Sequence, residues 1–325
     1  MYRKNFQDFT YIDLFAGIGG IRLAFEAAGG QCVFSSEWDE AAQKTYAANF
    51  GDTPQGDITQ IASADIPDHD ILTGGFPCQP FSIIGQKLGF ADTRGTLFFE
   101  IERILKDKQP HAFLLENVKQ LKTHDKGRTF RVIVQRLEEL GYFVHTTVLN
   151  ALDFGLPQKR ERTFFVGFKK NYHFAFPHQP SDQRFLRLDD ILEPESDVPQ
   201  KYFASEYIRN KRAKAVEHKT VFYPSIWHEN KGGNIGINNF SCALRAGASF
   251  NYLLVNGIRR LTPREQLRLQ GFPEGFVVLG SETDIRRQIG NSVPVKVVTE
   301  IARAMLRAMR VEQHEPAYFI TWKKT

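Results

Sequence analysis

The chain has 325 residues, enough for two domains or for one large domain with an insertion, and it shows neither a membrane-spanning apolar run nor a secretory signal. Its cysteines, Cys32, Cys78 and Cys242, are odd in number and far apart, which argues against a disulfide framework and favours a reducing cytoplasm. The net charge of +5 arises mainly in residues 181–270, with 14 Lys and Arg against 10 Asp and Glu. A polyanionic partner and an ordinary uneven surface explain this bias equally well.

Short apolar runs alternate with helical patterns through the first half of the chain. The apolar runs predict strands over 9–15, 31–38, 70–76, 111–117, 142–149 and 163–168. Helices are predicted between them over 21–28, 40–50, 96–108 and 130–140. The first helix should end at Gly29 and Gly30, and Asp39 is a suitable N-cap for the second. This alternation predicts an α/β fold with a doubly wound, mostly parallel sheet that helices cover on both faces.

The regular pattern ends near residue 177, where segments rich in Pro, Gly, Asn and Ser begin. This composition predicts an irregular second domain. Regularity returns at 293–309, where apolar residues recur on one helical face. We expect this last helix to rejoin the first domain.

Glycine, acidic and cysteine residues follow the predicted strands. In an open α/β sheet, ligands bind beyond the carboxyl ends of the strands. The residues concerned are Gly17, Gly19 and Gly20, Glu37 and Trp38, Asp57, Pro77 and Cys78, and Glu116 and Asn117. They are predicted to lie at one edge of the sheet and to form one site.

The glycine segment "DLFAGIGG" permits two interpretations, a cofactor loop and a tight strand–helix turn. The dinucleotide pattern GxGxxG fails, because Arg22 occupies the third glycine position. Glu37 lies where an acid can accept hydrogen bonds from ribose hydroxyls, and Phe15 and Trp38 could sandwich an adenine ring. With Asp57 available for the adenine amino group, the interpretation as an adenosine site is favoured.

Cys78 lies in "GGFPCQPFS", where Pro77 and Pro80 restrict the loop and hold the sulfur in place. An isolated cysteine in such a loop is more often inert, because a thiol needs local help to ionise at neutral pH. Glu116, at the end of a neighbouring strand, favours a nucleophile with a proton donor beside it.

The segment "QKRER" (158–162) precedes the strand 163–168. In an extended chain Gln158, Arg160 and Arg162 point to the same side. Two guanidinium groups on one face suit an oxyanion, a carbonyl oxygen or a phosphate, and a solvated charge run is an equal alternative.

These segments, together with "ENV" (116–118) and "GNSVP" (290–294), resemble the motifs of C5-cytosine DNA methyltransferases in their expected order. The chain is similar to the compact bacterial type found in restriction–modification systems. The resemblance covers nearly the whole chain except about 180–258. It implies a Rossmann-like S-adenosylmethionine-dependent methyltransferase fold with a smaller target-recognition domain. The implied boundaries are 1–188 for the catalytic domain, 189–274 for target recognition and 275–325 for a returning C-terminal segment.

The resemblance also implies a covalent mechanism in which the Cys78 thiolate adds to C6 of a flipped-out cytosine. Glu116 would bind and protonate N3, and Arg162, with Arg160 beside it, would hold O2. S-adenosylmethionine would donate the methyl group, with no metal. The implied cofactor residues are Phe15, Gly17, Ile18, Gly19, Glu37, Trp38, Asp57, Ile58, Pro77, Leu97 and Asn291.

Double-stranded DNA is the implied partner, with Ser82, Gln158, Asn234 and Arg245 as the expected DNA contacts. The family often has Thr-Leu where this chain has Ala243-Leu244, and this departure leaves open which side chains support the backbone of the flipped nucleotide. We expect a monomer that protects host DNA against a cognate endonuclease, which need not bind it.

Three other functions fit parts of the sequence. An RNA methyltransferase is disfavoured because the Cys-Phe-Thr segment usual in transfer-RNA relatives is missing between 162 and 290. A non-catalytic DNA-binding regulator is disfavoured by intact Cys78, Glu116 and Arg162. A nicotinamide oxidoreductase is disfavoured by the broken glycine pattern, and it would have no use for Cys78.

Overall fold

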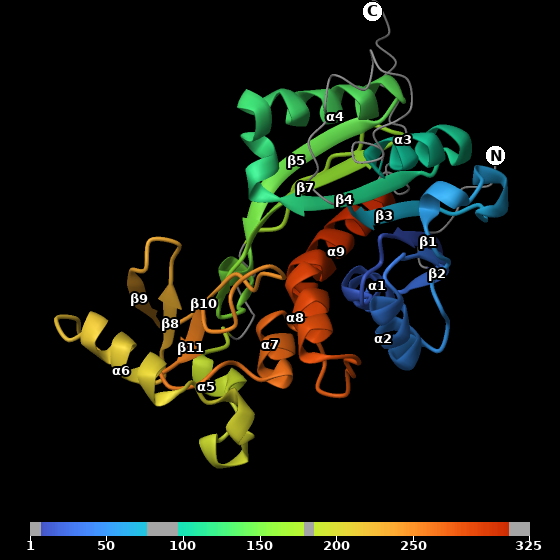
Figure 1. Ribbon diagram of the computed structural model, residues 1–325. Helices are drawn as coiled ribbons and strands as arrows, with labels where there is room; N and C mark the ends of the chain where they lie inside the picture. The colour runs from blue at the N-terminus through green and yellow to red at the C-terminus, as the bar shows by residue number, and fades with distance from the viewer. Residues whose placement is uncertain (1–7, 77–96, 179–184, 312–325) are drawn as a thin grey trace, which may run out of the picture.

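A six-stranded sheet forms the centre of the larger part of the molecule in the computed structural model, which describes residues 8–76, 97–178 and 185–311 (Figure 1). Its strand order is β2-β1-β3-β4-β7-β5. The strands are β1 (Phe9–Leu14), β2 (Gly30–Ser36), β3 (Ile71–Gly75), β4 (Ala112–Val118), β5 (Phe143–Asn150) and β7 (Glu161–Phe168). β7 runs antiparallel to both of its neighbours, and the neighbouring pairs among β2, β1, β3 and β4 are parallel. The predicted α/β fold with a mostly parallel sheet is confirmed.

Helices cover both faces of this sheet (Figure 1). The helices of the larger part are α1 (Gly20–Glu26), α2 (Glu40–Phe50), α3 (Leu97–Lys108), α4 (Arg128–Glu139) and α9 (Val295–Val311). Because side chains alternate along a strand, Tyr11 of β1 enters one apolar core with Phe25 of α1, and Ile12 enters the other with Ile101 of α3. α9 packs against α1 in the first core. No helix in the described ranges is both long and apolar enough to cross a membrane.

Capping residues explain where the predicted helix α2 begins and ends. The side chain of Asp39 caps α2 and accepts hydrogen bonds from the backbone N–H groups of Ala41 and Ala42, at 2.9 and 3.1 Å. Gly51 ends the helix with φ of 79°, in the left-handed region that favours glycine. The predicted N-cap is therefore confirmed.

The smaller part of the molecule contains secondary structure that composition did not predict. β8 (Ile226–Glu229), β9 (Ile235–Asn238) and β11 (Leu253–Val255) form an antiparallel sheet in the order β11-β8-β9. Val216, Trp227 and Ile235 form a small apolar core there. The short helices α5 (Leu188–Ile191) and α6 (Glu206–Ala215) belong to the same part (Figure 1).

A short strand pair and two helices join the smaller part to the larger one in the described residues. The short strand β10 (Ser241–Cys242) pairs in parallel with β6 (Gln158–Lys159), which directly precedes β7. The helices α7 (Pro263–Leu269) and α8 (Glu282–Asn291) lie between the smaller sheet and the main body (Figure 1).

At Gly167 of β7 the Phe113 ring packs directly against the backbone of the main sheet. A Cβ atom at this position would lie 2.1 Å from Cε1 of Phe113, a fully buried ring that packs edge-on against Tyr142. We therefore expect Gly167→Ala to lower the free energy of unfolding in urea by about 2–3 kcal/mol, because the ring has no free space to move into. Gly275→Ala is the matched control, since a Cβ there meets no atom within 4 Å. Equal stabilities of the two variants would contradict this packing.

Candidate active site

The glycine turn after β1 exposes backbone at the carboxyl edge of the sheet. Phe15, Gly17 and Gly19 have positive φ angles of 56°, 55° and 84°. A Cβ on Gly19 would overlap the ring of Phe50 at 2.2 Å, whereas a Cβ on Gly17 would meet no atom within 4 Å. A glycine is therefore needed at position 19 so that the Phe50 ring can pack against the backbone. Gly17 leaves open space in which a ligand can approach the backbone. Ile18, between the two glycines, is buried in the core.

Glu37 and Trp38 follow β2, and the Glu37 side chain contacts this turn. The Glu37 carboxylate accepts hydrogen bonds from the backbone N–H groups of Gly17 and Asp39, at 2.8 and 2.9 Å. Burial raises the pKa of Glu37, and these two N–H groups partly oppose the rise. The indole of Trp38 is 78% exposed, so a large aromatic surface beside a fixed carboxylate is available for stacking.

Asp57 and Ile58 begin a short turn that α3 supports. The Asp57 carboxylate accepts a hydrogen bond from the N–H of Thr59 at 2.9 Å, and Ile58 is buried. Arg103 of α3 donates hydrogen bonds to the carbonyl oxygens of Ile58 and Ile61, at 3.4 and 2.9 Å. The guanidinium therefore fixes this turn to α3, a connection that the sequence did not reveal.

Two further predicted cofactor residues lie at helix ends. Leu97 is the first residue of α3 and is partly buried, and Asn291 is the exposed last residue of α8. Pro77, Cys78 and Ser82 lie outside the described residues.

Glu116 and Arg162 form an ion pair at the end of β4. Nε of Arg162 lies 2.8 Å from Oε1 of Glu116, and the two side chains are 13% and 9% exposed. Burial raises the pKa of Glu116, and the guanidinium groups of Arg162 and Arg160 only partly oppose this rise. A Cβ on Gly75 of β3 would lie 3.4 Å from Oε2 of Glu116, so the bare backbone at Gly75 leaves room for the carboxylate. The pair can hold a polar ring and exchange a proton with it.

Asn117 links this pair to the segment that contains Cys78. Its side-chain amide donates a hydrogen bond to the carbonyl oxygen of Phe76 at 2.9 Å, in a buried setting. Phe76 is the last described residue before Pro77 and Cys78. The backbone is therefore fixed one residue before the predicted nucleophile segment begins.

Gln158 and Arg160 are fully buried and bond to backbone atoms of distant segments. The Gln158 side chain donates to the carbonyl of Leu269 at 3.1 Å and accepts from the N–H of Leu244 at 3.4 Å. Arg160 donates to the carbonyl oxygens of Leu244 and Gly290, at 2.8 and 2.9 Å, and to that of Ser292. The structure therefore places both side chains in the interior, away from solvent, and pairs Arg162 with Glu116.

Asn234 and Arg245 lie on the surface of the smaller part of the molecule. Asn234 closes a turn in which its N–H bonds the side chain of Asn230 at 3.0 Å. The Arg245 guanidinium lies over the ring of Tyr252, 4.9 Å from its centroid. Arg245 belongs to the loop 243–252, which β10 connects to β6 and so to the strand that carries Arg162.

The strand pairing brings the ends of three strands, and with them the glycine turn and Glu116, to one edge of the sheet. Leu14 pairs with Gly74, and Gly75 pairs with Glu116, so the carboxyl ends of β1, β3 and β4 lie side by side. Arg103 and Asn117 also support this edge.

Comparison with known proteins identifies the family. Residues 9–307 match the family model described as C-5 cytosine-specific DNA methylase. Type II methyltransferase M.HaeII of Haemophilus aegyptius is 56% identical over 305 residues, covering 94% of this chain and 95% of that protein. Type II methyltransferase M.NgoBI of Neisseria gonorrhoeae is 55% identical, covering 96% and 98%.

The chain belongs to the family of C-5 cytosine-specific DNA methylases. Its function is therefore the transfer of a methyl group to C5 of cytosine in DNA. The solved structure of Spodoptera frugiperda DNMT2 has a TM-score of 0.71 and 22% sequence identity, covering 93% of this chain and 99% of that one. At this identity the likeness shows a shared fold.

Asp13 of this methylase is the next-to-last residue of β1 and is completely buried. It accepts a hydrogen bond from the Thr73 hydroxyl at 3.0 Å, while its other oxygen has no hydrogen-bond partner among the described residues. Burial raises the pKa of Asp13 from 3.8 to about 7, although Thr73 and Arg22 oppose the rise.

This shift predicts a pH-dependent stability. Between pH 4 and pH 7 the native carboxyl keeps a proton that the unfolded chain releases, so the free energy of unfolding falls as pH rises through this range. The variant Asp13→Asn lacks this effect. Urea unfolding at several pH values should show the difference between wild type and variant shrinking or reversing by up to about 4 kcal/mol from pH 4 to pH 7. A difference that stays constant across that range would contradict the assigned shift.

Proposed function

We propose that this methylase is a type II enzyme that methylates a flipped-out cytosine within a short duplex sequence through a covalent bond to Cys78. The observation that carries the proposal is the buried ion pair of Glu116 and Arg162. It lies at the sheet edge, beside a backbone that Asn117 fixes one residue before Pro77 and Cys78.

The proposed chemistry begins with activation of the cytosine ring, because C5 is a weak nucleophile. The Cys78 thiolate forms a bond to C6, and the C5–C6 π electrons move toward N3, which Glu116 protonates. Arg162 donates to the cytosine O2 while it holds the Glu116 carboxyl in place. The raised pKa of Glu116 suits this role, because a carboxyl that keeps its proton more readily can donate it to N3. After methylation N3 returns its proton to Glu116, a base removes the C5 proton, and the C6–sulfur bond breaks to release the thiolate as the C5–C6 double bond forms again.

S-adenosylmethionine, when bound, supplies the electrophilic methyl group. The residues at the sheet edge fit its adenosine part. Glu37 presents a fixed carboxylate for the ribose hydroxyls, and Trp38 presents an exposed indole for the adenine face. Gly17 leaves open space for close approach, and Asp57 lies on the turn that Arg103 supports. Phe15, Gly19, Ile58, Leu97 and Asn291, with Pro77, complete the proposed pocket.

We propose the division of the chain that the family resemblance implies. Residues 1–188 bind the cofactor and perform the chemistry, 189–274 recognise the DNA target, and 275–325 return to the catalytic domain. Asn234 and Arg245, exposed on the smaller part, are the proposed DNA contacts there, with Ser82 approaching from the catalytic domain.

For Gln158 and Arg160 we propose positioning rather than direct contact with the substrate. Both are 0% exposed, and their polar atoms bond to backbone groups of Leu244, Leu269, Gly290 and Ser292. They therefore hold the target-recognition segment and the C-terminal segment against the strand that presents Arg162.

We further propose that the enzyme acts as a monomer in the cytoplasm, on double-stranded DNA, and protects that DNA from a cognate endonuclease. The type II methyltransferase names of the relatives support this role.

The decisive experiment maps methylation and tests the covalent bond together. Plasmid DNA treated with the enzyme and S-adenosylmethionine should show 5-methylcytosine at one short sequence by bisulfite sequencing. Cys78→Ala should abolish it. A duplex with 5-fluorocytosine at the target should trap a covalent adduct with the wild-type enzyme, because fluorine at C5 cannot leave as a proton does. Normal methylation by Cys78→Ala would overturn the proposal.

Glu116→Gln tests the proton donor separately. The amide keeps the size of the side chain but cannot protonate N3, so kcat should fall at least about a hundredfold. Binding of S-adenosylhomocysteine, measured by calorimetry, should stay within about twofold of wild type. Equal losses in binding and in turnover would instead show that Glu116 maintains the structure of the site.

A further inference from the structure

Helix α8 carries two neighbouring arginines that reach different parts of the molecule. Consecutive residues of a helix point about 100° apart, so the side chains of Arg286 and Arg287 leave different faces. One contacts the smaller part of the molecule and the other contacts the cofactor edge of the larger part. Neither residue was singled out by the sequence.

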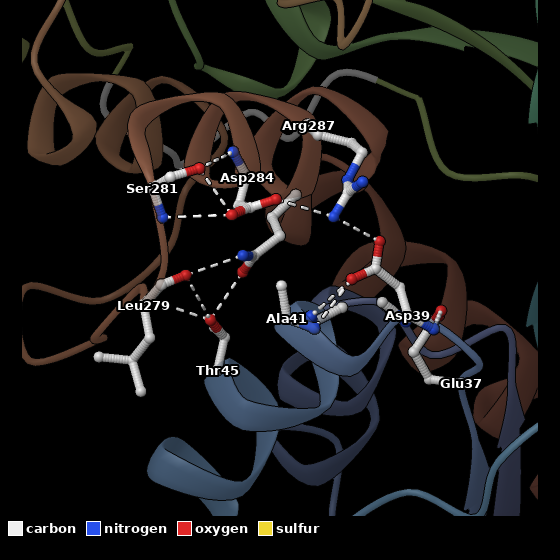
Figure 2. Close-up of polar contacts among 11 residues, drawn as sticks. Glu37, Asp39, Ala41, Thr45, Leu279, Ser281, Asp284 and Arg287 are labelled. Carbon is white, nitrogen blue, oxygen red and sulfur yellow. Dashed lines mark hydrogen bonds and ion pairs between the residues drawn. The ribbon is translucent and has the colours of Figure 1, made fainter.

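Arg287 contacts the element that follows Glu37 and Trp38. Its Nη2 lies 2.8 Å from Oδ2 of Asp39 and 3.0 Å from Oδ1 of Asp284 on its own helix (Figure 2). Asp39 is the N-cap of α2, and its N–H bonds the Glu37 carboxylate. Asp39 therefore joins α8 to Glu37, the proposed ribose-binding residue: its carboxylate pairs with Arg287, and its N–H bonds to Glu37.

A second contact beside this ion pair joins the same two helices. The Thr45 hydroxyl of α2 donates to Oε1 of Gln288 at 2.6 Å, and the N–H of Leu279 donates to the Thr45 oxygen at 2.9 Å (Figure 2). The contact between α2 and α8 thus has a buried hydrogen bond at Thr45 and a half-exposed ion pair at Asp39. Loss of the ion pair alone leaves the buried bond in place.

Arg286 contacts the loop 243–252. Its Nη2 donates to the carbonyl oxygens of Ala248 and Ser249, at 2.6 and 3.3 Å. Its guanidinium also lies over the Phe250 ring, 3.9 Å from the centroid. These contacts restrain the middle of a loop whose start is held by Arg160 and Gln158 at Leu244.

We infer that Arg286 and Arg287 are positioning residues for the two substrates, Arg286 for the DNA-reading loop and Arg287 for the cofactor wall. This inference rests on the proposed function, which assigns Glu37 and Trp38 to the cofactor and the loop 243–252 to DNA. One helix thereby holds both binding elements at a fixed distance from each other. The end of α8 is itself held, because the carbonyl of Gly290 accepts a hydrogen bond from Arg160.

Steady-state kinetics of the full-length enzyme test the inference, with the KM for S-adenosylmethionine and the KM for duplex DNA measured for each variant. Arg287→Gln should raise the KM for S-adenosylmethionine about threefold to fivefold, the range for a partly exposed ion pair, and leave the KM for duplex DNA within twofold. Arg286→Gln should raise the KM for DNA about tenfold, because it removes charge-assisted bonds and stacking, and leave the KM for S-adenosylmethionine within twofold. Arg287→Lys should restore the wild-type value, since the ammonium can still reach Asp39.

Control variants separate positioning from general stability. Arg303→Gln removes a half-exposed arginine of α9 that pairs with Glu300 and should change neither KM. Asp39→Asn keeps an oxygen for the α2 cap but loses the charge. Combined with Arg287→Gln, it should raise the KM no further than the larger single effect, because both changes remove one interaction. Equal rises in both KM values for either variant, or no change for both, would overturn the inference.

Trp38→Ala and Arg245→Ala distinguish failure of this inference from failure of the proposed sites. Trp38→Ala should raise the KM for S-adenosylmethionine, and Arg245→Ala should raise the KM for DNA. If they do so while the α8 variants have no effect, the sites stand and the positioning role is wrong. If Trp38→Ala and Arg245→Ala both leave the KM values unchanged, the proposed sites are wrong, and the inference falls with them.

Discussion

The guanidinium of Arg160 lies, fully buried, where three distant segments of the chain meet. It donates to carbonyl oxygens of Leu244, Gly290 and Ser292, which are 84 to 132 residues away along the sequence. Burial, together with the nearby charge of Arg162, lowers the pKa of Arg160 well below its usual value, because this environment disfavours a second positive charge. Removing a guanidinium from water costs several kcal/mol, and bonds from a charged donor return roughly 1.5–3 kcal/mol each. The arrangement is therefore stable only while three segments are in place: the one that carries Arg160, the one at Leu244 and the one at 290–292. The folding of these segments is coupled for this reason.

The same constraint explains why the "QKRER" segment has two roles. The sequence predicted that Gln158, Arg160 and Arg162 share one side and bind an anion or a carbonyl oxygen together. The structure places the first two in the interior and pairs Arg162 with Glu116 of β4. β6 ends at Lys159 and β7 begins at Glu161, so the extended strand that the alternation assumed is interrupted at Arg160. The carbonyl oxygens that Arg160 binds lie beyond any spacing that could be read from the local sequence.

The elements that depend on neighbouring residues were predictable, and those that depend on distant partners were not. The strands of the main sheet, the cap of α2 and the apolar face of α3 follow from local patterns, and the structure has them. The antiparallel direction of β7 and the pairing of β6 with β10 depend on contacts between segments far apart in the chain. The same holds for the supporting arginines. No local pattern singled out Arg103, Arg286 or Arg287, because the acceptors that give them a supporting role lie on other elements.

The smaller part is attached mainly through backbone atoms, so its position depends little on which side chains it carries. Arg160, Gln158 and Arg286 hold it through backbone atoms of Leu244, Ala248 and Ser249, and β10 joins β6 through a backbone ladder. A backbone carbonyl is present whatever residue occupies the position, so these contacts place few demands on the side chains of the loop. Apart from Phe250, on which Arg286 stacks, the exposed side chains of loop 243–252 can therefore differ while the loop stays at the same distance from Glu116 and Arg162. A scaffold of this kind can carry different exposed side chains on the loop beside one unchanged pair of Glu116 and Arg162, because most of the bonds that fix the loop are made to its backbone.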